Sequence, residues 1–388
     1  MVPNGWEKTT VGAACAIKNN LRFPINTEQR QSMAGVYPYF GPTGVLSHID
    51  HYRIDEEFAV IGEDGDHFLK FRSKPMTLHF EGKANVNNHA HVIADSEKCS
   101  PKWFYYWFMH RDLAPALSRQ GVGRYKLTKK GLEGLEILIP PKNEQLHISR
   151  ILSTWDKAIF NLERTIINSN KQKKALIHSL LSDRPRKKMG KKVLHREHAA
   201  SIFFPRSTRN NNELELLSVM QDVGVVPRSS LDRKVVMPEG STSGYKLVEA
   251  GDFVISLRSF EGGLEYSEYK GLVSPAYTVL SSKRPIVNDF YRHYFKSADF
   301  IGRLAVAVIG IRDGKQISYD DFSFLSLPYP SLVEQEEISR LLNNAESIIK
   351  KKKNELFLLR QEKIALMNQL LTGKRRVHFP DSETAAQA

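Results

Sequence analysis

Side chains that could read the edges of DNA base pairs are grouped in glycine-rich stretches of this chain. Asparagine, arginine, lysine, serine and threonine provide the donors and acceptors that distinguish base pairs in the grooves. The candidates in the first half are Tyr39, Thr43, Lys83, Asn85, Asn87, Asn88, Arg124 and Lys126. Those in the second half are Arg258, Ser259, Lys270, Ser274, Tyr277, Arg312, Lys315 and Gln316.

The same residue types also have ordinary structural uses. Asn87 and Asn88 could cap a turn, and the tyrosines could belong to a hydrophobic core. Arginine and lysine contacts to phosphate are expected more often than base contacts, and they carry no sequence information. The two kinds of contact therefore stay open for each cationic candidate.

An acidic pattern in the first half leaves a metal-dependent DNA nuclease as an alternative function. Asp64 or Asp66 is followed by Glu81-Gly82-Lys83, and paired carboxylates can hold Mg²⁺ while a nearby lysine stabilises charge. The pattern is short and has no counterpart in the second half. His89 and His91 alternate as residues on one strand face do, but two histidines without a nearby cysteine make an incomplete metal site, so we expect no metal.

Signatures of other chemistry are missing from the sequence. The chain contains no Asp/Asn-Pro-Pro-Tyr/Phe motif and no phosphate-binding Gly-x-x-x-x-Gly-Lys-Ser/Thr loop. The aromatic run Trp103–Phe108 could stack on bases, but at helical spacing it favours a core. The sequence therefore gives no support to an adenine methyltransferase or to a protein with this phosphate-binding loop.

Composition indicates a polyanionic partner. The 388 residues carry a formal net charge of +13, and the pI is near 9.5, which favours nucleic acid. No apolar run approaches the ~18 residues of a membrane span, and the N-terminus lacks the apolar core of a signal peptide. Two cysteines are too few for a disulfide framework. These features predict a cytoplasmic protein.

The elements that must position these candidates occur twice, at a constant offset along the chain. Glu144-Gln145 recurs as Glu334-Gln335, and 12 of the 38 positions in 144–181 are identical to their partners in 334–371. Such a large unit in only two copies predicts two globular domains rather than a solenoid. The middles of the domains have diverged, so the scaffold repeats while the loops differ.

Apolar residues recur in both copies with the 4, 3, 4, 3 spacing of a heptad seam. The seam residues are Ile148, Leu152, Trp155, Ile159, Leu162, Ile166, Ile338, Leu342, Ile349, Leu356, Leu366 and Leu370. Each helix would expose an apolar stripe if it were alone, so we predict that the two helices pair as an antiparallel coiled coil. Lys173 and Lys363 occupy equivalent seam positions. They either extend their ammonium groups to solvent or fix the register of the pair.

The predicted fold is α+β, with two mixed domains in a pseudo-two-fold arrangement separated by the long helices. The boundaries are a first domain at 1–143, a helix at 144–182, a basic linker at 183–196, a second domain at 197–333, a helix at 334–371 and a disordered tail at 372–388. Short apolar runs such as Phe58–Ile61 and Phe253–Ile255 predict strands. Aromatic spacing predicts a helix over 102–117 and another over 289–300.

In layout and motifs the chain resembles the specificity subunit of type I restriction-modification systems. The most specific residues are the domain-to-helix junction Ile139-Pro140-Pro141-Lys142-Asn143-Glu144-Gln145 and the terminal Asn368-Gln369-Leu370-Leu371-Thr372-Gly373-Lys374. Tyr37-Pro38-Tyr39-Phe40-Gly41-Pro42-Thr43-Gly44 and Asn85-Val86-Asn87-Asn88-His89-Ala90-His91-Val92 resemble segments of the family's recognition domains.

The resemblance implies two target-recognition domains, each reading one half of a bipartite DNA site. It implies that the helix pair sets the spacing and docks two methyltransferase subunits, which two restriction subunits could join. The resemblance also implies that the chain itself is not catalytic and binds no cofactor, so that S-adenosylmethionine, ATP and Mg²⁺ would belong to the partners. The second domain has Lys270-Gly271-Leu272-Val273-Ser274-Pro275-Ala276-Tyr277 where the first has the Asn/His segment, so the half-sites are expected to differ. A coiled-coil adaptor whose basic charge is incidental remains a further alternative.

Overall fold

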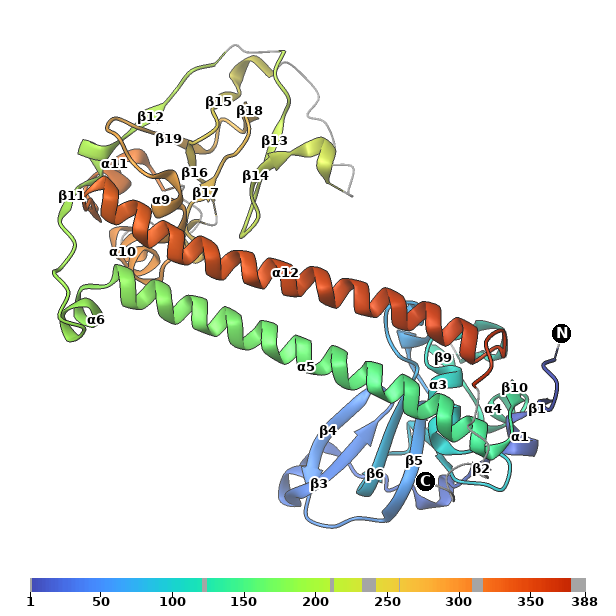
Figure 1. Ribbon diagram of the computed structural model, residues 1–388. Coiled ribbons are helices and arrows are strands. Elements are labelled where there is room, and N and C mark those ends of the chain that lie inside the picture. Colours follow the sequence, from blue (N-terminus) through green and yellow to red (C-terminus); the bar gives the residue numbers. More distant parts are fainter. Residues whose placement is uncertain are drawn as a thin grey trace, which may run out of the picture. The chain divides into compact units, whose positions relative to one another are not determined.

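The computed structural model describes residues 2–120, 124–209, 213–231, 242–257, 259–308 and 317–377. They fall into two compact units: residues 1–161 with 356–388 form unit 1, and residues 162–355 form unit 2. The two longest helices, α5 (Lys142–Leu181) and α12 (Leu332–Leu370), each begin in one unit and end in the other. Both are drawn in Figure 1, with α5 in green and α12 in red. The mixture of helices and sheets in each unit confirms the predicted α+β class.

Unit 1 is built around a six-stranded sheet. The strands of the whole unit are β1 (Glu7–Thr10), β2 (Ala16–Ile17), β3 (Ala34–Gly41), β4 (Gly44–Ile49), β5 (Ile54–Gly62), β6 (Thr77–Val86), β7 (Ala90–Ala94), β8 (Ser118–Gln120), β9 (Arg124–Lys126) and β10 (Glu136–Ile139). Its shorter helices are α1 (Val11–Ala14), η1 (Asn19–Leu21), α2 (Thr27–Ser32), η2 (Asp66–Lys70), α3 (Pro101–Phe108), η3 (Ala114–Ala116) and α4 (Lys129–Glu133).

The sheet has the order β2-β7-β5-β6-β3-β4. It is antiparallel except where β3 pairs with β6, so that Tyr39 lies beside Asn85. One hydrophobic cluster, which includes Phe40, Phe58 and Val92, comes from strand residues of this sheet. A second and larger cluster joins the sheet to α3 and to the long helices.

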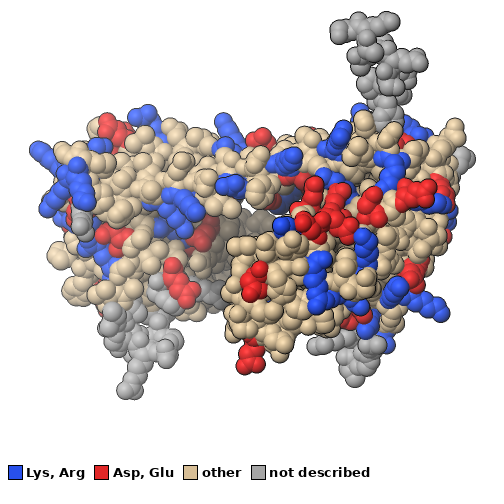
Figure 2. Space-filling model, turned by 90° about the horizontal axis from the view of Figure 1, so that it is seen from below, with Lys and Arg blue, Asp and Glu red and all other residues tan. Residues whose placement is uncertain are grey.

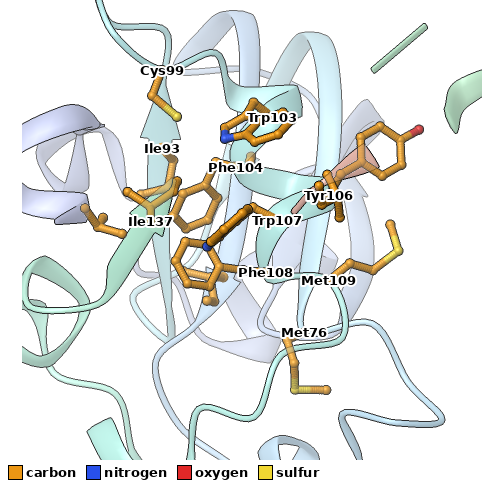
Figure 3. Close-up of a cluster of buried hydrophobic side chains, with 14 of the residues drawn as sticks. Met76, Ile93, Cys99, Trp103, Phe104, Tyr106, Trp107, Phe108, Met109 and Ile137 are labelled. Carbon is orange, nitrogen blue, oxygen red and sulfur yellow. The ribbon is translucent and has the colours of Figure 1, made fainter. Parts of the chain in front are cut away.

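The second cluster of unit 1 contains the aromatic residues of α3. Trp103, Phe104 and Phe108 are fully buried, and Figure 3 shows them gathered with Cys99, Ile93 and Ile137. The aromatic run therefore belongs to the core and is not available to stack on bases. The predicted helix 102–117 is too long, since α3 ends at Phe108 and Pro115 without an N–H opens a separate turn.

Unit 2 contains shorter strands. They are β11 (Arg196–His198), β12 (Phe203–Arg206), β13 (Leu217–Met220), β14 (Gly224–Pro227), β15 (Lys246–Val248), β16 (Phe253–Ile255), β17 (Glu265–Tyr266), β18 (Gly271–Val273), β19 (Thr278–Ser282) and β20 (Ser326–Pro328). Its shorter helices are α6 (Asp183–Lys188), α7 (Ala199–Ile202), η4 (Arg228–Ser230), η5 (Thr242–Gly244), α8 (Ser259–Gly262), α9 (Asn288–Tyr294), α10 (Ala298–Val308) and α11 (Tyr319–Ser323).

The sheets of unit 2 differ from those of unit 1. Strands β12-β19-β16-β17 form a four-stranded sheet, and β13-β14 and β15-β18 form separate two-stranded ladders. The core centres on Phe203, Phe253 and the aromatic residues of α9. The single helix expected over 289–300 is divided between α9 and α10, which begins at Ala298.

The parts of each unit nearest the long helices are built alike. Helix α4 in unit 1 and α11 in unit 2 occupy equivalent positions in the repeat, and each begins with a hydroxyl cap, from Thr128 and Ser318 respectively. A short antiparallel ladder follows in both, formed by β1 with β10 and by β11 with β20. The sequence repeat therefore corresponds to a repeated local structure.

Each unit also contains one stretch where the two long helices pack together. In unit 1, Ile148 and Leu152 of α5 share a core with Met367 and Leu370 of α12. In unit 2, Leu180 shares a core with Ile338 and Leu342. All twelve predicted seam residues are buried or half-buried: Ile148, Leu152, Trp155, Ile159, Leu162, Ile166, Ile338, Leu342, Ile349, Leu356, Leu366 and Leu370.

Two segments predicted as linker and tail are partly ordered. Arg186, in the basic linker, is buried and hydrogen-bonds to Glu334 at the start of α12. The prediction of a disordered tail does not hold for residues 372–377, because Arg376 is bound to Glu144 and to the Asn4 carbonyl. The rest of the tail lies outside the described residues.

Candidate nucleic-acid interface

Loops that are distant in sequence meet at one place in unit 1. The backbone N–H of Asn87 donates to the Phe40 carbonyl over 2.9 Å, and the backbone N–H of Glu63 donates to the His89 carbonyl over 2.8 Å. The Leu127 amide in turn donates to the Glu63 carbonyl over 2.8 Å. These bonds join the β3–β4 turn, the loop after β5, the β6–β7 turn and the segment after β9. They bring together the loops of five predicted candidates: Thr43, Asn87, Asn88, Arg124 and Lys126.

Charges within this loop cluster largely neutralise one another. The carboxylate of Glu63 is 2.7 Å from Nη1 of Arg22 and 3.2 Å from Nζ of Lys126. Asp64 accepts from Nδ1 of His89 over 2.7 Å and lies 4.0 Å from Lys126. Lys126 is therefore paired already, and a phosphate would have to compete with two carboxylates for it.

Thr43 and Asn88 are the exposed neutral candidates of the cluster. The Asn88 carbonyl accepts from Arg22 over 3.1 Å, which fixes the backbone of the turn. Arg124 lies on β9, and the position of its side chain is outside what the structure describes. Thr43 and Asn88 thus remain the strongest candidates for direct base contact in these loops.

Three predicted base contacts in unit 1 are corrected, because the side chains are buried. Tyr39 is 1% exposed and donates its hydroxyl to the Phe23 carbonyl over 2.6 Å. Asn85 is fully buried and donates to the His51 carbonyl over 2.7 Å. Asn87 accepts from the His89 amide over 2.9 Å, which is the turn-capping role that the sequence left open. These residues support the surface rather than form it.

His91 is a structural residue. It is 1% exposed, and its Nε2 lies 2.8 Å from the Leu127 carbonyl while Nδ1 lies 2.9 Å from the Asn19 amide. Burial lowers the pKa of His91, which favours the neutral ring. Both ring nitrogens are therefore engaged within the fold.

The carboxylates of the nuclease alternative lie on different elements, Asp64 in the loop after β5 and Glu81 on β6. Asp64 is bound to His89, whereas Glu81 stands opposite Glu57 on the β5–β6 ladder. Across the described part of the chain, no group of three or more His, Cys, Asp or Glu side chains is placed to hold a metal ion. The structure accordingly offers that alternative no assembled site.

In unit 2 the predicted candidates have mixed positions. Ser259 is fully buried, and its hydroxyl accepts from the Ser256 amide over 2.8 Å, so its assignment as a base contact is corrected. Lys270 is exposed but pairs with Glu249 over 3.0 Å. Ser274 and Tyr277 are half-buried, and Tyr277 packs against a cluster of valines. The remaining candidates lie outside the described residues: Arg258, Arg312, Lys315 and Gln316.

A second exposed group in unit 1 combines cations with aromatic rings. Nζ of Lys83 lies 4.6 Å from the centre of the Tyr52 ring, and that ring packs against Tyr37 at 5.0 Å. Beside them the Arg53 guanidinium lies 4.1 Å from the centre of the Phe23 ring. Only Lys83 was predicted as a contact. A signal was available, because His51-Tyr52-Arg53 is a polar, aromatic and basic run just before a strand.

Net charge alone does not locate the interface. On the face drawn in Figure 2, Lys and Arg side chains are interspersed with Asp and Glu. Cations that lack acidic partners are therefore better markers of the interface than the net charge. Among the described residues, no helix is long and apolar enough to cross a membrane.

Comparison with known proteins finds a family domain in the first part of the chain. Residues 3–172 match the family described as the type I restriction modification DNA specificity domain. The chain is 35% identical over 136 residues to a putative type I restriction enzyme specificity subunit of Haemophilus influenzae, covering 35% of this chain and 34% of that protein. It is 25% identical over 327 residues to the putative type I restriction enzyme MjaX specificity subunit of Methanocaldococcus jannaschii, covering 77% and 74% respectively.

A solved structure agrees with these relatives. The fold is similar to the crystal structure of the S subunit of a type I restriction-modification system from M. genitalium, with a TM-score of 0.60. That likeness extends over 96% of this chain and 98% of that one at 16% identity. Residues 3–172 thus match the DNA specificity domain of type I restriction-modification systems, and over most of its length the chain is similar to specificity subunits of such systems.

Proposed function

We propose that each unit carries a domain that reads one half of a bipartite, asymmetric DNA site, and that the long helices hold those domains apart. The observation that supports this most strongly is the repeated junction. Gln145 and Gln335 are both fully buried at the start of a long helix, and each donates to a proline carbonyl five residues earlier over 2.9 Å. Two domains are thus fastened to two helices in the same way.

The differences between the domains support an asymmetric site. Unit 1 presents a six-stranded sheet and its loop cluster, whereas unit 2 presents a four-stranded sheet and two small ladders. Base choice depends on loop geometry and on the donors and acceptors that the loops present. Two unlike surfaces on one repeated scaffold would read two unlike half-sites.

The helices are suited to set the spacing between half-sites. At 40 and 39 residues, each would extend ~60 Å at 1.5 Å per residue. Equivalent major-groove faces of DNA recur every ~34 Å. Inserting one heptad into both helices should therefore lengthen the nonspecific spacer of the recognised site. An unchanged spacer would refute this role.

We also propose that the chain itself is not catalytic and directs methyltransferase subunits, which dock on the helix pair. Restriction subunits could join the same assembly. S-adenosylmethionine, ATP and Mg²⁺ would be bound by those partners.

The experiment that tests the function is a map of methylated adenines in DNA from cells that co-express this chain with its methyltransferase subunit. We expect one bipartite motif with two different halves and a fixed gap. Exchanging residues 197–333 for the corresponding domain of a relative should change one half only. A complex that folds and associates but methylates no defined motif would contradict the proposal. Binding to DNA that is insensitive to salt would favour a structural adaptor instead.

A further inference from the structure

The exposed group around Lys83 is held in place by buried polar residues beneath it. Asn85, on the same strand, donates its amide to the His51 carbonyl, and the Arg53 amide donates to the Ala84 carbonyl over 3.2 Å. Both bonds fix the segment 51–53 against β6. We call His51, Tyr52, Arg53 and Lys83 the β6 rim.

The neighbouring segment is fixed in a similar way. Tyr39 donates its hydroxyl to the Phe23 carbonyl and accepts from the Ile25 amide over 3.3 Å. The Phe23 amide donates to the Val86 carbonyl over 2.7 Å. Phe23 is thereby placed under the Arg53 guanidinium, and its ring also packs edge-on against His51 at 4.9 Å. The rim is preorganised, so ordering it on binding would cost little entropy.

The two cations of the rim differ in their partners from those cations of unit 1 that pair with acids. Lys8, Lys18 and Lys98 each pair with a carboxylate at 2.9 Å. Across the part of the chain that the structure describes, neither Arg53 nor Lys83 takes part in an ion pair; both lie over aromatic rings. Asp55 is the acidic group opposite Lys83 across the β5–β6 ladder.

The charge of Lys83 is secure at neutral pH. The interaction with Tyr52, together with the negative charge of Asp55, raises the pKa of Lys83 above its ordinary value. A ring holds a cation in position without neutralising it. Cations that are fixed but not paired with acids are suited to meet an anion from outside the protein.

We propose that the β6 rim is a duplex-DNA contact of the first domain, in which Arg53 and Lys83 each bind a backbone phosphate. This rests on the proposed function, since it assigns part of the surface that recognises DNA. The rim would set the orientation of the domain, while the loop cluster with Thr43 and Asn88 would read bases. On this view, Asn85 and Tyr39 act as positioning residues beneath the contact.

The salt dependence of DNA affinity shows whether the rim cations contact phosphates or only add to the net positive charge of the protein. Each phosphate contact contributes about 0.9 to the slope of log affinity against log salt. We therefore expect Arg53→Ala/Lys83→Ala, in the full chain with its methyltransferase, to reduce that slope by about 2. Affinity should fall about tenfold or more for all sequences alike, and the methylated motif should stay the same.

A matched control removes the same charge elsewhere in unit 1. Lys8→Ala/Lys98→Ala also removes two positive charges, but both lysines already pair with carboxylates, so the slope should change little. Arg53→Lys/Lys83→Arg keeps both charges and should keep most of the slope. Thermal unfolding of every variant checks that exposed substitutions leave the fold intact.

The outcomes are distinct. A slope that falls only in the rim variant supports the phosphate contacts. A rim variant that behaves like the Lys8/Lys98 control overturns them, and so does a motif relaxed at a single position, which would make the rim a base reader. If the unaltered complex itself binds DNA without salt dependence, the proposed function fails, independently of the rim.

Discussion

An equivalent glutamate–arginine ion pair lies at the start of each long helix, but the buried partner is the glutamate in unit 1 and the arginine in unit 2. In unit 1, Glu144 is buried, with a side chain 3% exposed, and it accepts from both Arg376 and Trp6. In unit 2 the arginine is the buried partner: the side chain of Arg186 is 4% exposed, and that of Glu334 is 38% exposed. The residues are equivalent, because Glu334 and Arg376 stand in the second copy of the repeat where Glu144 and Arg186 stand in the first.

The surroundings explain the exchange. In unit 1 the indole of Trp6 donates to Glu144 over 3.0 Å and covers it, whereas Arg376 belongs to the chain's last described segment and stays partly exposed. In unit 2 the chain continues through α6, and Arg186 donates to the carbonyls of Leu180 and Lys192 over 3.0 and 2.8 Å. A repeated sequence thus sets which residues pair, while the connections of the chain decide which partner is buried.

The largest effects are expected at the buried glutamines. Gln145 accepts from the Ser100 amide and donates to the carbonyls of Lys98 and Pro140, within 2.7–2.9 Å. Each lost bond costs about 1 kcal/mol, and stranded buried groups cost more. Gln145→Ala should therefore destabilise unit 1 by about 3 kcal/mol. Gln335 makes two such bonds, to Val287 and Pro330, so Gln335→Ala should cost unit 2 about 2 kcal/mol.

The two units can be followed separately. All four tryptophans, Trp6, Trp103, Trp107 and Trp155, belong to unit 1, so tryptophan fluorescence in urea reports on that unit. Hydrogen exchange of α9 reports on unit 2. Gln361→Ala and Gln172→Ala, at exposed positions of α12 and α5, are controls that should cost almost nothing. Equal losses from the buried and exposed glutamines would contradict the proposed role of the junction.

Because a different partner is buried at each junction, breaking the two ion pairs should reduce stability by different amounts. Arg376→Ala leaves the carboxylate of Glu144 buried with only the Trp6 indole, so it should destabilise unit 1 by about 2 kcal/mol. Glu334→Ala leaves Arg186 with two backbone carbonyls and should cost about 1 kcal/mol or less. Urea unfolding and hydrogen exchange measure the two losses. If Glu334→Ala lowers stability more than Arg376→Ala does, the burial of the partner left behind does not determine the cost of breaking each pair.

The helices and part of each domain could be predicted because they depend on local periodicity. A heptad spacing determines which side of a helix is apolar, and β5 and β16 contain the predicted strands at Phe58–Ile61 and Phe253–Ile255. Tyr39 and Asn85 could not be placed, because their burial depends on how β3 and β6 pair. The ordered tail depends likewise on a contact between Arg376 and Glu144, which are far apart in the sequence.

Replacing the two seam lysines, Lys173 and Lys363, should have smaller and unequal effects on stability. Lys363 is 9% exposed, pairs with Asp156 and lies 5.7 Å from the Tyr106 ring. Lys173 pairs with Glu346 over 2.9 Å, and that glutamate also accepts from Arg292 over 2.9 Å. Lys363→Met should cost unit 1 about 1 kcal/mol, whereas Lys173→Met should be nearly neutral because Arg292 remains.

A double Lys→Leu variant asks whether these lysines also fix the register of the helices. Unchanged helicity by circular dichroism, together with an unchanged oligomeric state, would reduce them to ordinary packing residues. A shift in either property would show that the polar seam positions select one pairing of the helices.

The smallest effect is a dependence of unit 2 on pH. Burial alone would raise the pKa of Glu346, but the Lys173 hydrogen bond and the charges of Arg292 and Lys173 hold it below its ordinary value of 4.5. A carboxyl with a lowered folded pKa stabilises the protein above its unfolded pKa, and that stability is lost as pH falls through the folded value. Unit 2 should therefore weaken as pH drops below about 4.5. Glu346→Gln should flatten this dependence in hydrogen exchange of α9, and Lys173→Met should move it toward higher pH. If Lys173→Met leaves the profile unchanged, Arg292 alone sets the charge state of Glu346, and the seam lysine of unit 2 contributes packing only.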